Sequence, residues 1–447
     1  MIIIQDESKY TGEADAVYTP ETVEELKEII RTAKKEGKKL TPHGSLTGIT
    51  GAGVPCGSCA LDMTHLKRVE IYTKNNEWFV RMQSGITGDE AEGYIRQKTK
   101  NEMFLPVFPT EKTATLGGIA ATGARGIHFW KYGKLIDYVD GMTVIEADGE
   151  EKYLRRNEKG FLDYFRSEGM YGVIVSLEIR LITKPRYWWG ILFQFVKKDS
   201  ASDFAEKISG MKEIIVLEYL DNRTIRLIEK YKKNLESISE LPDIENDIYS
   251  AVYVEIAGDS EESLMEQAEI LLERCLELEE DPERAWAVCT EEEIERLRAY
   301  RHAASECVNM EIALSHGKDE RIYKLSLDIQ KDLKDRKKIL KVYENIFESC
   351  GIQYCIFGHW GTGGPYVNMI PKDYEQYQKG LYIFETVIKK AYAEGAEVFY
   401  EHGVGKVKKQ LFLKCAPDRL QKEMECIKGI KDEDGFWNPQ NMISEKI

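Results

Sequence analysis

Apolar residues near the start of the chain recur at helical spacing and are followed at once by a short strand. One stripe of the predicted helix consists of Val23, Leu26, Ile29 and Ile30. Thr19 is the candidate N-cap, Pro20 suits the first turn, and Gly37 ends the helix before the strand-like run at 39–42. Residues 19–40 therefore predict a helix that leads into a strand.

Strand-like runs continue along the chain, and their context changes near residue 185. Before it, the predicted strands are 79–83, 142–147 and 172–181. After it, the predicted strands are 188–196, 214–220, 252–256 and 323–329. These later strands alternate with long, charged amphipathic helices, one of which opens with a capping-box pattern at Asp259 and Glu262. A further helical segment begins at about residue 374.

This order of elements predicts an α+β protein. A chain of 447 residues exceeds what one hydrophobic core usually serves, so two domains are expected. We place the first domain at 1–185 and a second domain, with an antiparallel sheet, at 186–395. A C-terminal helical segment at 396–447 is expected to fold back on the first domain.

Composition and charge exclude several classes of partner. The formal net charge of −15 supplies no bulk positive charge for nucleic acid or anionic lipid. No apolar run approaches the ~20 residues that a membrane helix needs. The first residues also lack the basic start of a secretory signal. We therefore expect a cytoplasmic protein without a nucleic-acid partner or a transmembrane segment, and we keep a homodimer as an assembly to test.

The nine cysteines indicate reduced thiols, because their number is odd and their positions are scattered. Cys56 and Cys59 form a single CxxC pair, with no second pair at the spacing of a zinc or cluster site. Two thiols in a glycine-rich turn are therefore favoured over a redox or metal role.

Two glycine-rich blocks are the main chemical signal of the sequence. The first covers 43–53 and follows the predicted strand at 39–42, and the second covers 115–126. Glycines let a backbone come close to a ligand and turn consecutive N–H groups toward an anion. Neither block has the GxGxxG spacing of a Rossmann domain. The blocks therefore predict a ligand with phosphate groups, held by another kind of fold.

An ordered set of landmarks around these blocks resembles the PCMH-type FAD-binding domain of the vanillyl-alcohol-oxidase superfamily. Within it, the pattern is that of the branch with glycolate oxidase and the D-lactate and D-2-hydroxyglutarate dehydrogenases. The landmarks of the first half are 19–20, 44–48, 61–62, 84–87, 111–118, 132–133 with Asp137, 147–150 and 171–175. Those of the second half are 358–361, 401–406 and 438–439. The resemblance implies a two-subdomain FAD-binding domain followed by an α+β substrate (cap) domain.

The resemblance also implies that FAD lies extended between two subdomains, with its pyrophosphate on the first glycine-rich block and its flavin along the second. The implied cofactor-binding residues are Pro42, His43, Gly44, Ser45, Leu46, Thr47, Gly48, Thr110, Thr113, Thr115, Leu116, Gly117, Gly118, Ala121, Gly123, Ala124, Gly172, Val173, Ile174 and Asn438. His43 is the candidate for a covalent tether. It precedes Gly44, however, whereas the tethering histidine of covalent members usually follows the paired glycines. We therefore expect non-covalent FAD.

The substrate side needs a base for a hydroxyl proton and a cation for a carboxylate. His402, next to Glu401, is the candidate base, and a purely structural histidine is the alternative. Arg301 and Lys324 resemble carboxylate-binding positions of the hydroxy-acid branch. Surface placement is the alternative for both, since the chain has 62 lysines and arginines.

A metal motif of the same branch is present only in part. Metal-dependent members carry His-x-Gly-x-Gly-Asn-x-His and a later glutamate. Here His359 and Glu401 match, Gly364 replaces the asparagine, and Tyr366 replaces the second histidine. Tyrosine is a poor zinc ligand, so we favour a site without zinc, manganese or iron over a site with one. Tyr366 becomes a candidate acid, base or hydrogen-bond donor near the flavin, with a packed tyrosine as the alternative.

Together these residues favour an FAD-dependent oxidoreductase of class EC 1.1. It would oxidise a 2-hydroxy acid or related alcohol by hydride transfer to flavin N5, and pass electrons to an electron-transfer flavoprotein, a quinone or oxygen. One alternative is a non-redox FAD enzyme of the alkylglycerone-phosphate synthase type, which the stretches at 362–363 and 402–406 also resemble. Another is a flavin-carrying electron-transfer subunit of a complex.

Overall fold

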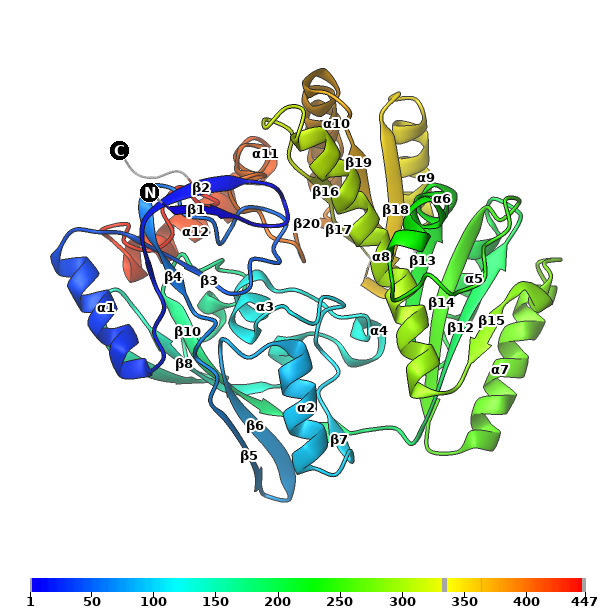
Figure 1. Cartoon of the computed structure of the whole chain (residues 1–447), viewed down its shortest axis with the longest axis horizontal. Coiled ribbons are helices and arrows are strands. Elements are labelled where there is room, and N and C mark those ends of the chain that lie inside the picture. Colours follow the sequence, from blue (N-terminus) through cyan, green and yellow to red (C-terminus); the bar gives the residue numbers. More distant parts are fainter. Residues whose placement is uncertain (1, 332–335, 363, 444–447) are drawn as a thin grey trace.

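The computed structural model describes residues 2–331, 336–362 and 364–443 and consists of two α+β parts (Figure 1). Strands of the first part end at Thr183, and the first strand of the second part begins at Tyr187. A C-terminal segment returns from the second part to the first. The fold class expected from the sequence is therefore confirmed, whereas the boundaries at 185 and 395 stay predictions.

The first subdomain is a four-stranded sheet in the order β1-β2-β4-β3. Its strands are β1 (Ile2–Gln5), β2 (Thr11–Tyr18), β3 (Leu40–His43) and β4 (Ser58–Asp62). β1 and β2 are antiparallel, and β4 runs parallel to both β2 and β3. Helix α1 (Val23–Lys35) packs its buried stripe against β3 and β4.

The N-cap of α1 is Thr22, not the expected Thr19. The Thr22 side chain accepts a hydrogen bond from the backbone N–H of Glu25. The helix thus begins where its buried stripe begins, one turn later than the position of Pro20 suggested.

The second subdomain is a five-stranded antiparallel sheet in the order β5-β6-β10-β8-β9. Its strands are β5 (Val69–Lys74), β6 (Glu77–Gln83), β8 (Val139–Ile145), β9 (Glu151–Arg155) and β10 (Val173–Arg180). The helices of this subdomain are α2 (Gly88–Lys98), α3 (Leu116–Thr122) and α4 (Phe129–Tyr132). A short ladder joins β7 (Met103–Phe104) to β11 (Ile182–Thr183). The expected strands at 79–83, 142–147 and 172–181 correspond to β6, β8 and β10.

The second part of the chain is built on a seven-stranded antiparallel sheet in the order β15-β12-β14-β13-β18-β19-β16. Its strands are β12 (Tyr187–Phe195), β13 (Ile214–Asp221), β14 (Ser250–Gly258), β15 (Trp286–Val288), β16 (Leu325–Leu327), β18 (Gln353–His359) and β19 (Tyr366–Ile370). The helices are α5 (Ser200–Ile208), α6 (Asn222–Tyr231), α7 (Glu261–Leu276), α8 (Glu291–His316), α9 (Arg336–Glu348) and α10 (Tyr374–Ala393).

Two expectations for this part need correction. Ser260, not Asp259, is the N-cap of α7, and its hydroxyl accepts from the backbone N–H of Ser263. The single strand expected at 323–329 is divided into β16 and β17 (Ile329–Gln330). The division arises because β16 pairs with β19, whereas β17 pairs with β20 (Glu397–Val398) near the C-terminus.

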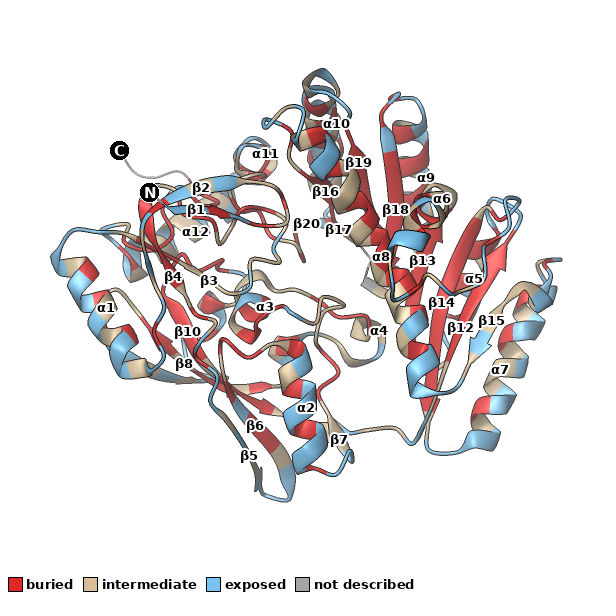
Figure 2. Cartoon of the chain, in the orientation of Figure 1, coloured by how far each residue is buried: buried red, intermediate tan, exposed pale blue. Residues whose placement is uncertain are grey.

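The C-terminal segment carries α11 (Lys409–Cys415) and α12 (Asp418–Lys431) and ends against the first subdomain (Figure 1). The Leu40 amide donates to the Phe436 carbonyl at 3.0 Å, and Trp437 is fully buried in the cluster under α1. Figure 2 shows that inner strands such as β8, β10, β13 and β14 are largely buried, whereas most of β1 and β2 and the outer faces of α1 and α7 are not. The expected return of the C-terminus to the first domain is confirmed.

No helix within the described ranges is both long and apolar enough to cross a bilayer. All nine cysteines are free thiols, with Cys59 buried in β4 and Cys56 partly exposed.

Candidate active site

A cavity of about 820 Å³ lies between the glycine-rich segments of the first part and helix α8 of the second. Residues from 42–50, 109–125 and 167–174 line it on the first side. One face of α8, with His302, Ser305 and Asn309, lines it on the other, together with Lys324 and the turn at 401–402. In Figure 1 these walls are the region of β3 and α3 and the long helix α8. The cavity volume is in the range of small-molecule and cofactor sites.

The two glycine-rich blocks meet in this cavity at Gly44 and Thr115. A Cβ atom on Gly44 would lie 2.0 Å from Thr115 Oγ1, so only glycine lets the loop pass at this point. Strand β3 leads directly into Gly44. Thr115 is the N-cap of α3, and its Oγ1 accepts a 3.4 Å hydrogen bond from the Gly118 amide. Two segments far apart in the sequence therefore form one surface.

Most of the cofactor-binding residues expected from the sequence line this cavity. They are Pro42, His43, Gly44, Ser45, Leu46, Thr47, Gly48, Thr110, Thr113, Thr115, Gly117, Gly118, Ala121, Ala124, Gly172, Val173 and Ile174. The other three support the walls: Leu116 is buried in α3, and Gly123 ends α3 at a φ of 78°. Asn438 donates to the carbonyl oxygens of Ala52 and Glu168 at 2.9 and 2.6 Å. Direct contact of any of these residues with a cofactor stays a prediction.

Several buried polar atoms of the walls have no hydrogen-bond partner in the part of the chain that the structure describes. Two of them are His43 Nε2 and Ser84 Oγ, and both residues line the cavity. The other ring nitrogen of His43 is already paired with the Gly44 carbonyl at 2.8 Å. Since buried polar atoms are normally hydrogen-bonded, these two atoms are placed for a polar ligand.

His402 lines the same cavity and is oriented by Asp328. Its Nδ1 lies 3.3 Å from Asp328 Oδ1, and Asp328 is fully buried. The other carboxylate oxygen accepts from the Glu401 amide at 2.8 Å. Burial opposes ionisation of Asp328, but His402, Lys408 and that amide outweigh it and hold its pKa below the ordinary value. Because the Asp328 carboxylate can only accept a hydrogen bond, His402 Nδ1 must carry the proton that it donates. In a neutral ring, Nε2 is then free to accept a proton.

The turn that follows His402 is fixed by Glu168. Its carboxylate accepts from the amides of Val404 and Gly405 at 2.7 and 2.9 Å. A Cβ on Gly405, which has a φ of 57°, would lie 2.1 Å from the Thr50 carbonyl oxygen. Burial raises the pKa of Glu168 despite these hydrogen bonds. The His402 turn is thus held against both the first glycine-rich loop and the 167–169 segment.

Behind the cavity wall, His359 lies between two carboxylates. Its Nδ1 contacts Glu218 Oε1 in a short hydrogen bond, and its Nε2 lies 3.6 Å from Glu401 Oε1. The Tyr366 hydroxyl donates to the second Glu401 oxygen at 2.7 Å. Burial disfavours the charged ring, but Glu218 and Glu401 outweigh it and raise the pKa of His359 to about 9. Burial also raises the pKa of Tyr366, so its hydroxyl stays protonated.

The two cations expected to bind a carboxylate have different surroundings. Arg301 is buried but does not line the cavity, and its Nε donates to Glu218 at 2.6 Å. Lys324 lines the cavity, and its Nζ donates to Asn309 Oδ1 at 2.6 Å. Burial lowers the pKa of Lys324 to about 7, against the attraction of Glu7. Neither residue is on the surface.

Comparison with known families decides what this cavity belongs to. Residues 14–154 match the profile of the FAD binding domain, and residues 185–442 match that of the C-terminal domain of FAD linked oxidases. The chain belongs to the FAD-linked oxidase family. The resemblance drawn from the sequence is thereby confirmed, and FAD is the cofactor.

Relatives of this FAD-linked oxidase match it over nearly its whole length. The glycolate oxidase subunit GlcD of Bacillus subtilis is 26% identical over 98% of this chain and 90% of its own. The D-lactate dehydrogenase of Anaerostipes hadrus is 24% identical over 97% of this chain and 91% of its own. The D-2-hydroxyglutarate dehydrogenase of Rattus norvegicus is 24% identical over 97% and 78%, and is mitochondrial by name. The cytoplasmic location expected here stays a prediction.

Among solved structures, 4-ethylphenol oxidase from Gulosibacter chungangensis has the same fold. It matches with a TM-score of 0.70 and 14% identity over 98% of this chain and 90% of that one. An alkyldihydroxyacetonephosphate synthase matches with a TM-score of 0.65 and 16% identity over 95% and 75%. At these identities the likeness concerns the fold alone.

The cavity of the FAD-linked oxidase fits FAD. At Gly44 the two glycine-rich walls meet in a contact that a Cβ would block, and glycine backbone in these walls allows the close approach that an extended dinucleotide needs. The unpaired His43 Nε2 and Ser84 Oγ add polar groups for its many oxygens. The expected placement of the pyrophosphate at 44–48 and of the flavin along the second block stays a prediction. Non-covalent attachment stays a prediction.

The side chains around His359 do not form a binding site for a divalent metal. Within the described ranges, no three His, Cys, Asp or Glu side chains are grouped to hold an ion. Both nitrogens of His359 face carboxylates, Arg301 neutralises Glu218, and the Tyr366 hydroxyl occupies Glu401. The charges of this cluster are therefore balanced without an ion. Gly363, within the metal-type motif, lies outside the described residues.

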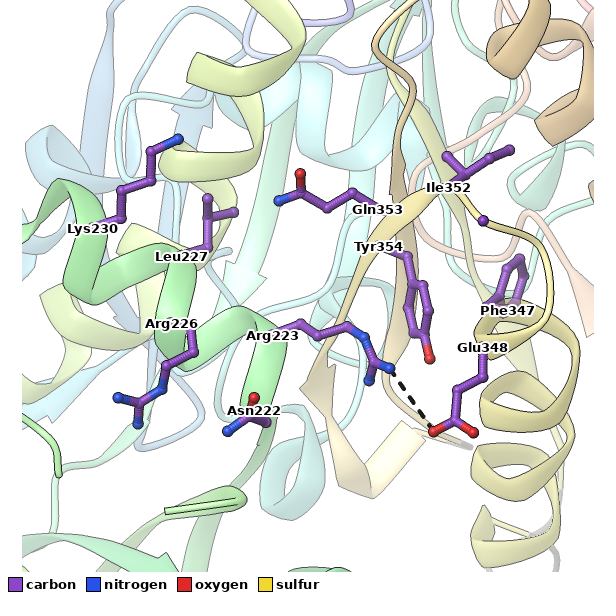
Figure 3. A pocket seen from close by; sticks show the side chains of 11 residues that line it. Asn222, Arg223, Arg226, Leu227, Lys230, Phe347, Glu348, Ile352, Gln353 and Tyr354 are labelled. Carbon is purple, nitrogen blue, oxygen red and sulfur yellow. Dashed lines mark ion pairs between the residues drawn. The ribbon is translucent and has the colours of Figure 1, made fainter. Parts of the chain in front are cut away.

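A second pocket of about 450 Å³ lies away from this site, between α6 and the segment that joins α9 to β18 (Figure 3). Its cations already have partners. Arg223 stacks on Tyr354 at 4.2 Å and lies 3.8 Å from Glu348, and Arg226 donates to Asn246 at 2.9 Å. We therefore place the chemistry of the oxidase in the larger cavity.

Sequence reasoning missed three polar residues of the site: Asp328, Glu168 and Glu218. Each lies far along the chain from the side chain that it holds and belongs to no glycine-rich motif. It also missed Arg125, which lines the cavity within the second glycine-rich block. The sequence did contain a sign of its role: Arg125 is a large charged residue beside Gly126, in a block whose other residues are uncharged and mostly small.

Proposed function

We propose that this FAD-linked oxidase is a dehydrogenase that converts a 2-hydroxy acid to the corresponding 2-oxo acid. The observation that carries the proposal is one arrangement: His402, oriented by Asp328, lines the same cavity as Lys324 and the two glycine-rich blocks. The candidate base, the candidate carboxylate-binding cation and the cofactor-binding segments thus line one cavity. The names of the relatives, which include D-lactate dehydrogenase and a glycolate oxidase subunit, support the same substrate class.

His402 acts as the base. Its Nδ1 proton is held by Asp328, so Nε2 accepts the proton of the substrate hydroxyl and the positive ring that results lies beside a buried carboxylate. The Glu401 amide keeps Asp328 in place from the other side. This pair has the geometry of a base and its orienting carboxylate.

Lys324 binds the substrate carboxylate. It is 3% exposed and lines the same cavity, where Asn309 holds its ammonium group. Binding an anion there restores the charged form that burial disfavours. The carboxylate and the hydroxyl of a 2-hydroxy acid would then be fixed at two points, which orients the intervening C–H bond.

When bound, FAD supplies the two-electron acceptor for the hydrogen that leaves the carbon. The balance is complete: the substrate loses a proton to His402 and a hydride to the cofactor, and a carbonyl forms. The electrons then pass to an acceptor outside the chain, for which an electron-transfer flavoprotein, a quinone and oxygen are the candidates. Rates of cofactor reoxidation with each would rank them.

The proposal is tested with a panel of D- and L-2-hydroxy acids and an artificial dye as acceptor. Wild-type protein is expected to turn over at least one of them, and His402→Asn to lose about 10²–10⁴-fold in kcat. An acylated glycerone phosphate with a fatty alcohol serves as the competing reaction. Turnover of that pair without dye reduction, and of no hydroxy acid, would assign the non-redox reaction instead.

A further inference from the structure

Arg125 is a buried cation that has no carboxylate partner among the described residues. It is 3% exposed and lines the large cavity. Its guanidinium is held between the rings of Phe129 and Tyr400, at 4.3 Å from each. Its Nη2 donates to Gln330 Oε1 at 2.7 Å, while Nε and Nη1 find no acceptor among the residues that the structure describes. A buried cation without a counter-ion is costly, and an incoming anion would relieve that cost.

Acids lie near Arg125, but none of those that the structure describes is paired with it directly. Burial lowers the pKa of Lys134, the charges of Arg125 and Arg166 lower it further, and Glu397 and Asp137 oppose them. Burial opposes ionisation of Glu401, but the charges of His359, His402 and Arg125 outweigh it and lower its pKa. The Glu401 oxygens are already engaged by the Tyr366 hydroxyl and His359, which leaves the unpaired guanidinium nitrogens of Arg125 for a ligand.

Arg125 lies at the His402 end of the cavity, not at the phosphate-binding end. Helix α3 separates the two, because Thr115 caps its start and Gly123 ends it. Seven helical residues span roughly 10 Å. Gly44 touches Thr115 at the start of α3, whereas Gly403 lies next to Thr122 at its end. The proposed pyrophosphate loop is therefore at one end, and Arg125 and His402 at the other.

Arg125 and Lys324 stand on different walls. Lys324 contacts Asn309 of α8 and the Ser8 carbonyl of the N-terminal hairpin, and the cations that act on it most are Lys408 and Lys9. Arg125 packs instead against Phe129 of α4 and Tyr400. A carboxylate bound by Lys324 would therefore leave Arg125 without an anionic partner.

We propose that Arg125 forms a second anion-binding position of the active site, so that the substrate carries an anionic group besides the carboxylate at Lys324. That group is a carboxylate or phosphate at the other end of the same small hydroxy acid. Both match the planar fork of a guanidinium. The inference rests on the proposed function in assuming that substrate and FAD share this cavity.

The test measures binding without turnover, by the change in flavin absorbance when unreactive acids are added to the holoenzyme. Succinate and 3-phosphonopropionate carry two anionic groups, and butyrate carries one. Wild type is expected to bind one of the first two roughly 10- to 100-fold more tightly than butyrate. Whichever of the two binds more tightly identifies the second group as carboxylate or phosphate.

Arg125→Met is expected to abolish that preference while butyrate affinity and FAD content stay unchanged. Arg125→Gln repeats the test if methionine disturbs folding. Arg223→Met is the matched control, since it removes another arginine stacked on a tyrosine but outside the cavity. Equal wild-type binding of butyrate and the dianions, equal weakening of all three probes in the variants, or loss of FAD would overturn the proposal. A failed hydroxy-acid panel with an intact Arg125-dependent preference would count against the proposed reaction alone.

Discussion

Asp328 Oδ1 lies 3.3 Å from His402 Nδ1, and this contact joins the residue between β16 and β17 to the turn that carries the candidate base. Asp328 also accepts the Glu401 amide, so one buried carboxylate fixes both the position and the tautomer of His402. It is a positioning residue.

Asp328→Asn is expected to lower kcat about 10- to 100-fold, because the amide no longer selects the Nδ1–H tautomer. Stopped-flow reduction of the cofactor by the preferred hydroxy acid measures this. The Kd for butyrate and the FAD content should stay at wild-type values, which separates a positioning effect from a general loss of structure. Asp373→Asn, at the exposed N-cap of α10, is the control and should leave kcat unchanged. A fall in butyrate affinity equal to the fall in kcat would contradict the assignment.

The contact between Gly44 and Thr115 predicts a steric requirement for FAD binding. Gly44→Ala places a methyl group where Thr115 Oγ1 lies, so the two glycine-rich blocks must separate. FAD affinity, measured by fluorescence titration of the apoprotein, is expected to fall at least tenfold. Gly93→Ala in α2 meets no atom within 4 Å and should leave FAD affinity intact. Unchanged affinity in Gly44→Ala would show that the blocks do not act together.

The depressed pKa of Lys324 predicts that carboxylate binding weakens as the pH rises. Below pH 7 the ammonium group is charged and attracts an anion; above it the free amine does not, so the Kd of butyrate should increase by up to about tenfold per pH unit. The charged groups that act on Lys324 are Glu7, Lys408, Lys9 and Asp6. Lys324→Arg keeps its charge at all accessible pH values and should flatten the profile. A pH-independent Kd in wild type would count against Lys324 as the binding group.

The His359 cluster predicts an oxidase whose activity survives metal removal. The charges of Glu218 and Glu401 are balanced by Arg301 and by the His359 ring, and the Tyr366 hydroxyl also donates to Glu401, so chelator treatment should not lower kcat. Elemental analysis should find less than one zinc, manganese or iron per chain. Tyr366→His restores the second histidine of the motif, whose ring nitrogen is a good zinc ligand. The zinc content is therefore expected to rise. A stoichiometric metal in wild type, together with chelator-sensitive kcat, would reverse this account.

The sequence could predict the parts of the site that depend on backbone. Two such parts are the glycine-rich segment that follows strand β3 and the one at the start of α3. Both can be recognised locally, from the glycines in the sequence. Lys324 and His402 were expected from motifs, and the cavity contains both.

The buried charge partners could not be predicted, because they are set by strand register. Glu218 reaches His359 only because β13 and β18 pair with these two residues opposite each other. Arg301 reaches the same carboxylate from helix α8, a contact that the number of lysines and arginines in the sequence does not reveal. The expected helix starts were wrong by a smaller margin: the N-cap Thr22 lies three residues after Thr19, and the N-cap Ser260 lies next to Asp259. All four residues are of types that make good caps, so packing decides between them.

Anaerobic mixing of the purified holoenzyme with the panel of 2-hydroxy acids tests the central claim most directly. The account predicts that the visible flavin absorbance disappears with at least one of them, that one 2-oxo acid forms for each flavin reduced, and that His402→Asn slows both equally. A flavin that stays oxidised with every acid in the panel, in protein fully loaded with FAD, would contradict it.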